Sequence, residues 1–303
     1  MNEQPKTLLE AVRYFSDADR AFDFVKSLRW PTGEPVCPHC GCLEHSFLTT
    51  RRIWKCKSCR RQFSIKVGSI FEDSPIGFDK WLPAMWLLAN SKNSISSYEV
   101  GRALGVTQKT AWFMLHRLRE AMRSGTFEKM GGVVEVDETY IGGKGENMHR
   151  YIIRLNGPIQ KIAVQGVRER ESGTVHAEVV DGRNLTSNVV AWVKPRSTVN
   201  TDEARAYRNL RRNFTHKTVS HSGPIAHRYV NGDASTNGIE NFWSILKRAI
   251  KGTQIHISKP HTSRYVIERE FAYNYRNESD LTRMRIALSN VGGRRLTWNE
   301  LTQ

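Results

Sequence analysis

Three acidic side chains are placed where metal-ion chemistry would need them. Asp137 lies inside the β-branched run 133–141, Asp202 follows an apolar-leaning segment, and Glu240 lies on a helix predicted over 238–251. Carboxylate oxygens suit Mg²⁺ and Mn²⁺, and two such ions about 4 Å apart can activate an oxygen nucleophile and stabilise the leaving oxygen of a phosphodiester. The three acids therefore predict metal-dependent phosphodiester chemistry.

The sequence around each acid restricts its role. Side chains alternate along a strand, so Asp137 and Glu138 point to opposite faces, and Glu138 is left out of the predicted site. Asp202 also suits a second interpretation, as the cap of the helix predicted after it. Glu240 and Lys247 lie opposite an apolar helical stripe, and no lysine or arginine lies three or four residues after Glu240. The stripe consists of Ile239, Phe242, Trp243, Leu246, Ala249 and Ile250.

Four of the five cysteines form two Cys-x-x-Cys pairs with fifteen residues between them: Cys37, Cys40, Cys56 and Cys59. Four thiolates at this spacing can close the tetrahedral shell of one structural Zn²⁺, at about 2.3 Å from the ion. Disulfides are the alternative, but cytoplasmic thiols stay reduced, and the short spacing strains a direct bridge. Three neighbours stay open as replacement ligands: Cys42, His39 and His45.

The chain has a strong excess of positive charge. Its 303 residues carry 46 Lys+Arg against 30 Asp+Glu, so the formal net charge is 46 − 30 = +16. Such a field concentrates polyanions, and nucleic acid is the predicted partner, with a generally solvated basic surface as the alternative. One basic cluster is interleaved with Trp54 and Phe63, which either stack on bases or form a small core. That cluster is Arg51, Arg52, Lys55, Lys57, Arg60 and Arg61, and a second is Arg205, Arg208, Arg211, Arg212, Lys217 and Arg228.

The stretch 96–122 predicts a helix-turn-helix. A helix ending at Leu104 is followed by Gly105-Val106 and by a helix that opens at Thr107. The apolar face of the second helix leaves five polar residues outward, suited to a major groove: Gln108, Lys109, Thr110, His116 and Arg117. Because packing helices look similar, plain structural helices are the alternative.

The remaining pattern predicts a mixed α/β protein. Helices are expected over 7–28, 78–122, 185–193 and 260–275, and strands over 133–141, 162–167 and 174–180. The expected parts are an N-terminal helical segment (1–31), a zinc ribbon (32–72), the helix-turn-helix region (76–125), an α/β domain (130–277) and a basic C-terminal tail (278–303). No apolar run approaches the ~18 residues of a membrane span and no secretory signal is read, so the expected location is the cytoplasm.

With these residues assembled, the chain resembles the bacterial insertion-sequence transposases of the DDE type that carry an N-terminal zinc ribbon, the ISXO-type group. The resemblance extends from about Leu8 to Arg276. Besides the ribbon it depends on three strings: VDETYIGG from Val136 to Gly143, TDEA from Thr201 to Ala204, and NGIENFWSILKR from Asn237 to Arg248.

The resemblance implies a ribonuclease H-like, retroviral integrase-like core with Asp137, Asp202 and Glu240 as its Mg²⁺ or Mn²⁺ ligands and Lys247 near the cleaved DNA. The implied function is a DNA transposase that binds terminal inverted repeats of double-stranded DNA, cleaves a phosphodiester and transfers the strand to target DNA. A homo-oligomer is expected because two ends must be paired. Two rivals stay open: a nuclease of the same fold that does not join ends, and a DNA-binding regulator whose core has lost catalysis.

Overall fold

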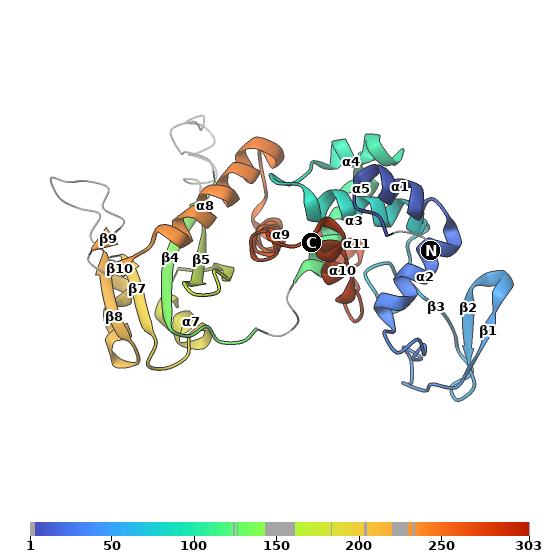
Figure 1. Cartoon of the computed structure of the whole chain (residues 1–303), viewed down its shortest axis with the longest axis horizontal. Coiled ribbons are helices and arrows are strands. Elements are labelled where there is room, and N and C mark those ends of the chain that lie inside the picture. The colour runs from blue at the N-terminus through green and yellow to red at the C-terminus, as the bar shows by residue number, and fades with distance from the viewer. Residues whose placement is uncertain are drawn as a thin grey trace. The chain divides into compact units, whose positions relative to one another are not determined.

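The computed structural model describes residues 4–123, 125, 127–142, 161–182, 184–202, 205–219, 230–231 and 234–302. The chain folds into two compact units, coloured along the chain in Figure 1. The first unit comprises Met1–Gly125 together with Asn277–Gln303, and the second comprises Thr126–Arg276. The mixed α/β class expected from the sequence is confirmed.

The first unit opens with α1 (Leu8–Phe15) and α2 (Ala18–Arg29), followed by a three-stranded antiparallel sheet of β1 (His45–Leu48), β2 (Ile53–Cys56) and β3 (Gln62–Ser64). Thr7 caps α1 in a capping box with Glu10. Trp54 is 2% exposed and Phe63 is 1% exposed, and their rings stack with centroids 5.7 Å apart. These aromatics therefore form the small core under the sheet, and of the two interpretations base stacking is excluded for them.

Three further helices follow: α3 (Phe78–Asn90), α4 (Ser97–Leu104) and α5 (Gln108–Met122). Gly105 ends α4 in the left-handed region with φ 61°, and Thr107 caps α5 by accepting a hydrogen bond from the Thr110 amide. A left-handed glycine followed by a capping threonine makes the tight turn between the two helices. The structure thus has two helices joined by a tight turn here, and a DNA-binding role for the pair stays a prediction.

The outward placement of His116 and Arg117 was wrong, because both are buried. Nε of Arg117 donates to the Leu296 carbonyl at 2.9 Å and Nη1 donates to the Glu72 carbonyl at 2.7 Å. The guanidinium therefore joins two segments distant in sequence. Only the first turns of α5 keep exposed polar side chains, with Lys109 exposed and Gln108 and Thr110 half-buried.

The segment after residue 277 is not an extended basic tail. It contains α10 (Asp280–Ser289) and α11 (Trp298–Thr302), and it packs within the first unit. Met284 and Ala287 are fully buried, and the Gly293 amide donates to the Gly68 carbonyl at 2.8 Å. The sequence prediction gave weight to the four arginines of this segment and overlooked the small apolar face that packs within the unit.

The second unit is built on a five-stranded sheet in the order β6-β5-β4-β7-β8. The first three of these strands pair antiparallel, and β4, β7 and β8 pair parallel. The strands are β4 (Val133–Ile141), β5 (Ile162–Glu169), β6 (Val175–Val180), β7 (Thr198–Asp202) and β8 (Thr215–Val219). A separate two-stranded ladder joins β9 (Val230–Asn231) and β10 (Ala234–Ser235).

Helices cover both faces of this sheet. On one face α8 (Asn237–Ala249) and α9 (Thr262–Asn274) pack over Ile141, Val164 and Val175. On the other face α7 (Leu185–Trp192) and the 3₁₀ helix η3 (Arg205–Arg212) pack over Val134, Val136 and Val199. Alternation along β4 therefore directs Val134 and Val136 to one layer and Asp137 to the other, as the sequence predicted.

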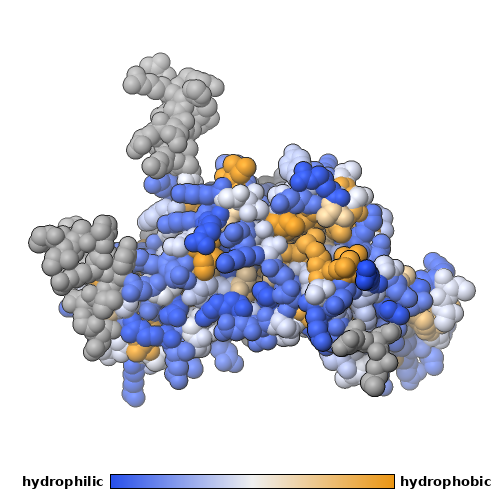
Figure 2. Space-filling model, turned by 45° about the horizontal axis from the view of Figure 1, so that its top comes forward, coloured by the Kyte–Doolittle hydropathy of each residue, from blue (hydrophilic) through white to orange (hydrophobic). Residues whose placement is uncertain are grey.

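Hydrophilic residues predominate on the face drawn in Figure 2, in line with 25% charged residues in the chain. Within the part of the chain that the structure describes, every helix is too short or too polar to span a bilayer.

The outer edge of β6 is closed by side chains of α9. Asn274 bonds both the amide and the carbonyl of Val175 at 2.8 Å, and a Glu270 oxygen accepts from the Ala177 amide at 3.0 Å. An unpaired strand edge is a template for aggregation, and these contacts satisfy part of it. The same Glu270 lies 3.3 Å from Nδ1 of His176, whose Nε2 lies 3.3 Å from Glu178.

We expect His176 to make stability depend on pH. Burial disfavours the imidazolium, but the hydrogen bonds to Glu178 and Glu270 outweigh it and raise the pKa of His176 to about 9. This stabilisation is fully present below the unfolded pKa of about 6.5 and is lost as pH rises through about 9, a change of roughly 3 kcal/mol.

Urea unfolding midpoints measured from pH 6 to pH 10 for the wild type and His176→Gln will check this expectation. The difference in unfolding midpoint between the two proteins should shrink steadily as pH rises. The other titrating groups are the same in both proteins, so their contributions cancel in this difference. A difference that stays constant with pH would show that His176 is not charged in the folded state.

Candidate active site and zinc centre

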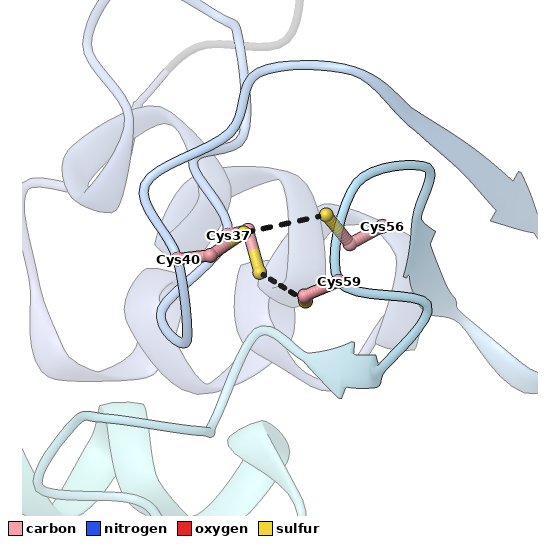
Figure 3. A group of neighbouring side chains, drawn as sticks. All are labelled: Cys37, Cys40, Cys56 and Cys59. Carbon is pink, nitrogen blue, oxygen red and sulfur yellow. Dashed lines mark hydrogen bonds between the residues drawn. The ribbon is translucent and has the colours of Figure 1, made fainter.

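Four cysteine side chains converge between two loops of the first unit. Figure 3 shows Cys37 and Cys40 on the loop before β1, facing Cys56 at the end of β2 and Cys59 in the turn that follows. Their sulfur atoms all lie within 4.8 Å of one another. This is the geometry that four ligands of one tetrahedral ion require, and the predicted structural zinc centre is supported.

Without a metal ion the surroundings favour a thiolate at Cys56, whereas burial and the hydrogen bonds to the other three thiols raise the pKa of Cys59 to about 12. A hydrogen bond from the backbone amide of Cys59 is the main reason that the pKa of Cys56 is lowered to about 6. The three open candidates stay outside the cluster. The sulfur of Cys42 accepts from the Glu44 amide at 3.3 Å, Nε2 of His45 lies 3.0 Å from the Pro35 carbonyl, and His39 is exposed.

In the second unit, Asp137 and Asp202 lie at the same level of neighbouring strands. In the parallel pairing of β4 with β7, each residue of β4 lies opposite the residue 65 positions later in the sequence. The pairs run from Val133 with Thr198 to Glu135 with Asn200. The same offset places Asp202 beside Asp137, two residues beyond the last pair. Both side chains therefore belong to the face that α8 covers.

Glu240 and Lys247 lie on the outer side of α8. All six predicted stripe residues are buried, five on α8 and Ile250 directly after it, whereas Glu240 is half-buried and Lys247 is exposed. Oε1 of Glu240 accepts from the hydroxyl of Thr236 at 3.2 Å. The amphipathic pattern read from the sequence is therefore correct for this helix.

The electrostatics connect the three acids. Burial, with added repulsion from Asp202 and Glu240, raises the pKa of Asp137 to about 6. A buried carboxylate repelled by two other acids is a position that a divalent cation would stabilise, so the donor set fits Mg²⁺ or Mn²⁺. Among the described residues, however, only the four cysteines bring three or more metal-ligating atoms within 4.8 Å.

Glu138 belongs to a different cluster, on the face covered by α7 and η3. Burial raises the pKa of Glu138 to about 7, although a hydrogen bond from Tyr207 opposes the shift. The Tyr207 hydroxyl also accepts from Nε2 of Gln165 at 3.2 Å, and Oε1 of Gln165 accepts from Asn188 at 2.9 Å. The parity argument that separated Glu138 from Asp137 is consistent with these contacts.

Sequence reasoning missed two polar contacts that hold α8 against β4. The amide of Ile239 donates to Oε2 of Glu135 at 2.9 Å, and Nε1 of Trp243 donates to Oδ2 of Asp137 at 2.9 Å. Glu135 also lies 3.6 Å from Arg168 and 3.4 Å from Arg170. Strand alternation placed Glu135 on the same face as Asp137, and that was the available signal.

Exposed basic residues remain in both predicted clusters. Around the cysteines, the exposed members are Arg51, Lys55, Lys57, Arg60 and Arg61, and on η3 they are Arg208, Arg211 and Arg212. Residues 220–229, which include Arg228, lie outside the described residues. These side chains are available to phosphates, as the sequence predicted.

Comparison with known proteins gives a family match in each unit. Residues 129–274 match the family of ISXO2-like transposase domains, and residues 16–62 match the family of transposase zinc-ribbon domains. A protein of Halobacterium salinarum in the transposable element ISH50, itself uncharacterized, is 25% identical over 282 residues, which cover 86% of this chain and 93% of the relative.

A solved structure is also similar. A chain in the cryo-EM structure of the simian T-cell lymphotropic virus intasome in complex with PP2A regulatory subunit B56 gamma is 14% identical, with a TM-score of 0.28. The match covers 56% of this chain and 63% of that chain. This likeness is too low to support an inference.

Proposed function

The chain belongs to the insertion-sequence transposases that join a zinc ribbon to an ISXO2-like DDE domain, and on this premise we propose that it cleaves the ends of its own element and joins them to target DNA. The observation that carries the proposal is that neighbouring parallel strands carry Asp137 and Asp202, and that repulsion from Asp202 and from Glu240 of α8 adds to the raised pKa of Asp137. The strand order of that unit fits a ribonuclease H-like core.

We assign the metal ligands to Asp137, Asp202 and Glu240. When bound, Mg²⁺ or Mn²⁺ would supply a water or hydroxyl nucleophile and stabilise charge on the leaving oxygen. Asp137 is held by β4 at the centre of the sheet, Asp202 by the end of β7, and Glu240 by α8. Three elements of one unit therefore carry the proposed ligands.

Lys247 is proposed to bind a DNA phosphate near the cleaved bond. It is exposed, and it lies seven residues after Glu240 on the outer side of α8. Seven residues of helix span about 10.5 Å, close enough for one DNA segment to contact both residues. The exposed arginines of η3 would hold the adjacent backbone.

The zinc ribbon and the α4–α5 pair are proposed to recognise the terminal inverted repeats. The ribbon presents exposed lysines and arginines, and α5 presents Gln108, Lys109 and Thr110 at its first turns. Burial of His116 and Arg117 limits any reading to this end of the helix. Pairing two ends requires at least two protomers, and we propose a homo-oligomer as the acting form.

A strand-transfer assay tests the proposal directly. The purified protein is incubated with its own element ends, supercoiled target DNA and Mg²⁺ or Mn²⁺. We expect donor 3′ ends to become covalently joined to the target, and Glu240→Gln to lose the joined product. Cleavage without joining would support the nuclease rival, and specific binding without cleavage would support the regulator.

A further inference from the structure

The indole of Trp243 lies where it can fix the orientation of one carboxylate, that of Asp137. Its Nε1 donates to Oδ2 of Asp137 across 106 residues of sequence, with a nitrogen–oxygen distance of 2.9 Å. The ring itself is 4% exposed, within the core that α8 forms on the sheet. A buried indole N–H requires an acceptor, and here the acceptor is the acid at the centre of the site.

The neighbouring strand is shaped to admit this ring. Gly166 of β5 pairs with Asp137 in the sheet, and the two therefore share a face. A Cβ at residue 166 would lie 2.7 Å from Cη2 and 2.9 Å from Cζ2 of Trp243. Any larger residue at 166 would displace the indole, so the missing side chain is what allows the hydrogen bond.

A second contact fixes the helix that carries Trp243. Oε2 of Glu135 accepts from the amide of Ile239, in the first turn of α8, where Thr236 makes no capping bond with its side chain. Glu135 thus replaces the missing cap from a strand of the sheet. A Cβ on Gly238 would lie 2.7 Å from that same oxygen and closer still to the guanidinium of Arg168, so the first turn of α8 lies directly against these two side chains.

We propose that Trp243 is a positioning residue, which orients the carboxylate of Asp137 for metal binding and is admitted to this place by Gly166. The inference rests on the proposed function, because it assigns Asp137 to the metal site. The hydrogen bond engages Oδ2 and restricts rotation of the carboxylate, so Oδ1 keeps one direction. The two links between β4 and α8 also set the separation of Asp137 from Glu240, which is on the same helix as Trp243.

Removing the N–H donor while keeping an aromatic side chain is the direct test. Trp243→Phe should lower single-turnover cleavage of element ends and weaken Mn²⁺ binding, each by about 10- to 100-fold, as is usual when a group that orients a metal ligand is lost. Mn²⁺ affinity is measured by electron paramagnetic resonance of the free ion, which needs no activity. Affinity for uncut DNA ends should stay unchanged.

Gly166→Ala should reproduce both losses, because its Cβ displaces the indole. Trp192→Phe is the matched control, since Trp192 packs in the core on the opposite face of the sheet. Replacing Trp243 by benzothienylalanine, which exchanges only the N–H for sulfur, keeps the shape if Trp243→Phe fails to fold, and the same losses are expected.

Mn²⁺ affinity and cleavage within twofold of the wild type in a folded variant would overturn the proposal. Equal loss of DNA binding, Mn²⁺ binding and thermal stability would also overturn it, by showing a structural role alone. Full activity of Asp137→Asn would instead contradict the proposed function, so the two failures are distinguishable.

Discussion

Asp137→Asn is expected to abolish DNA cleavage and strand transfer, with a rate loss of roughly 10³-fold or more. The substitution keeps the size and the acceptor oxygen for Trp243 but removes the negative charge that a divalent ion needs. Because burial, with added repulsion from neighbouring acids, raises the pKa of Asp137 to about 6, removing its charge should not destabilise the fold. The measurement is single-turnover cleavage of labelled element ends, with thermal melting recorded in parallel.

Glu171→Gln is the matched control. Glu171 is an exposed acid in the turn between β5 and β6, and its substitution removes the same charge from the same unit. We expect wild-type cleavage from this variant. If Asp137→Asn retains more than a tenth of the wild-type rate, the acid is not a metal ligand and the assignment of the site is wrong.

Cys40→Ser is expected to remove zinc from the protein and to unfold the ribbon. Binding of a structural zinc ion contributes about 10–16 kcal/mol of apparent free energy in small zinc domains, far more than a three-stranded sheet of this size can supply from its core. Cys40 is the exposed member of the cluster, whereas Cys56 is fully buried. Its loss therefore tests coordination with little change in packing.

In Cys40→Ser the zinc content, measured by elemental mass spectrometry, should fall from one ion per chain to near zero. Binding of the variant to element ends should weaken. Cys42→Ser is the control, because Cys42 lies outside the cluster of four sulfurs. It should keep one zinc ion and full DNA binding. Stoichiometric zinc in Cys40→Ser, or zinc loss in Cys42→Ser, would contradict the four-cysteine centre.

Local patterns were sufficient wherever the chemistry or the periodicity is itself local. The run 133–141 alternates clearly, and β4 has these same limits. The stripe of α8 repeats at helical spacing, and all its members are buried. Two Cys-x-x-Cys pairs supply the four ligands that a tetrahedral zinc ion needs, so the sequence predicted the zinc centre and its ligands.

Burial of a side chain by a segment distant in the sequence could not be predicted in the same way. His116 and Arg117 were assigned to the polar side of α5 by periodicity, yet both are buried, and Arg117 bonds the Leu296 carbonyl of the C-terminal segment. Nothing in residues 107–122 records that a segment more than a hundred residues later packs there. The same reason explains why helices α10 and α11 were missed after residue 277.

The sequence by itself determined which residue types are present for chemistry: four thiolates at zinc spacing, three acids, and an excess of positive charge. Tertiary structure alone decided how those groups are held. The bonds from Trp243 to Asp137 and from Ile239 to Glu135 depend on how closely α8 approaches the sheet, and that distance is set by glycines on two different elements. Spacing along a chain specifies faces, whereas contact between faces is a property of the packed core.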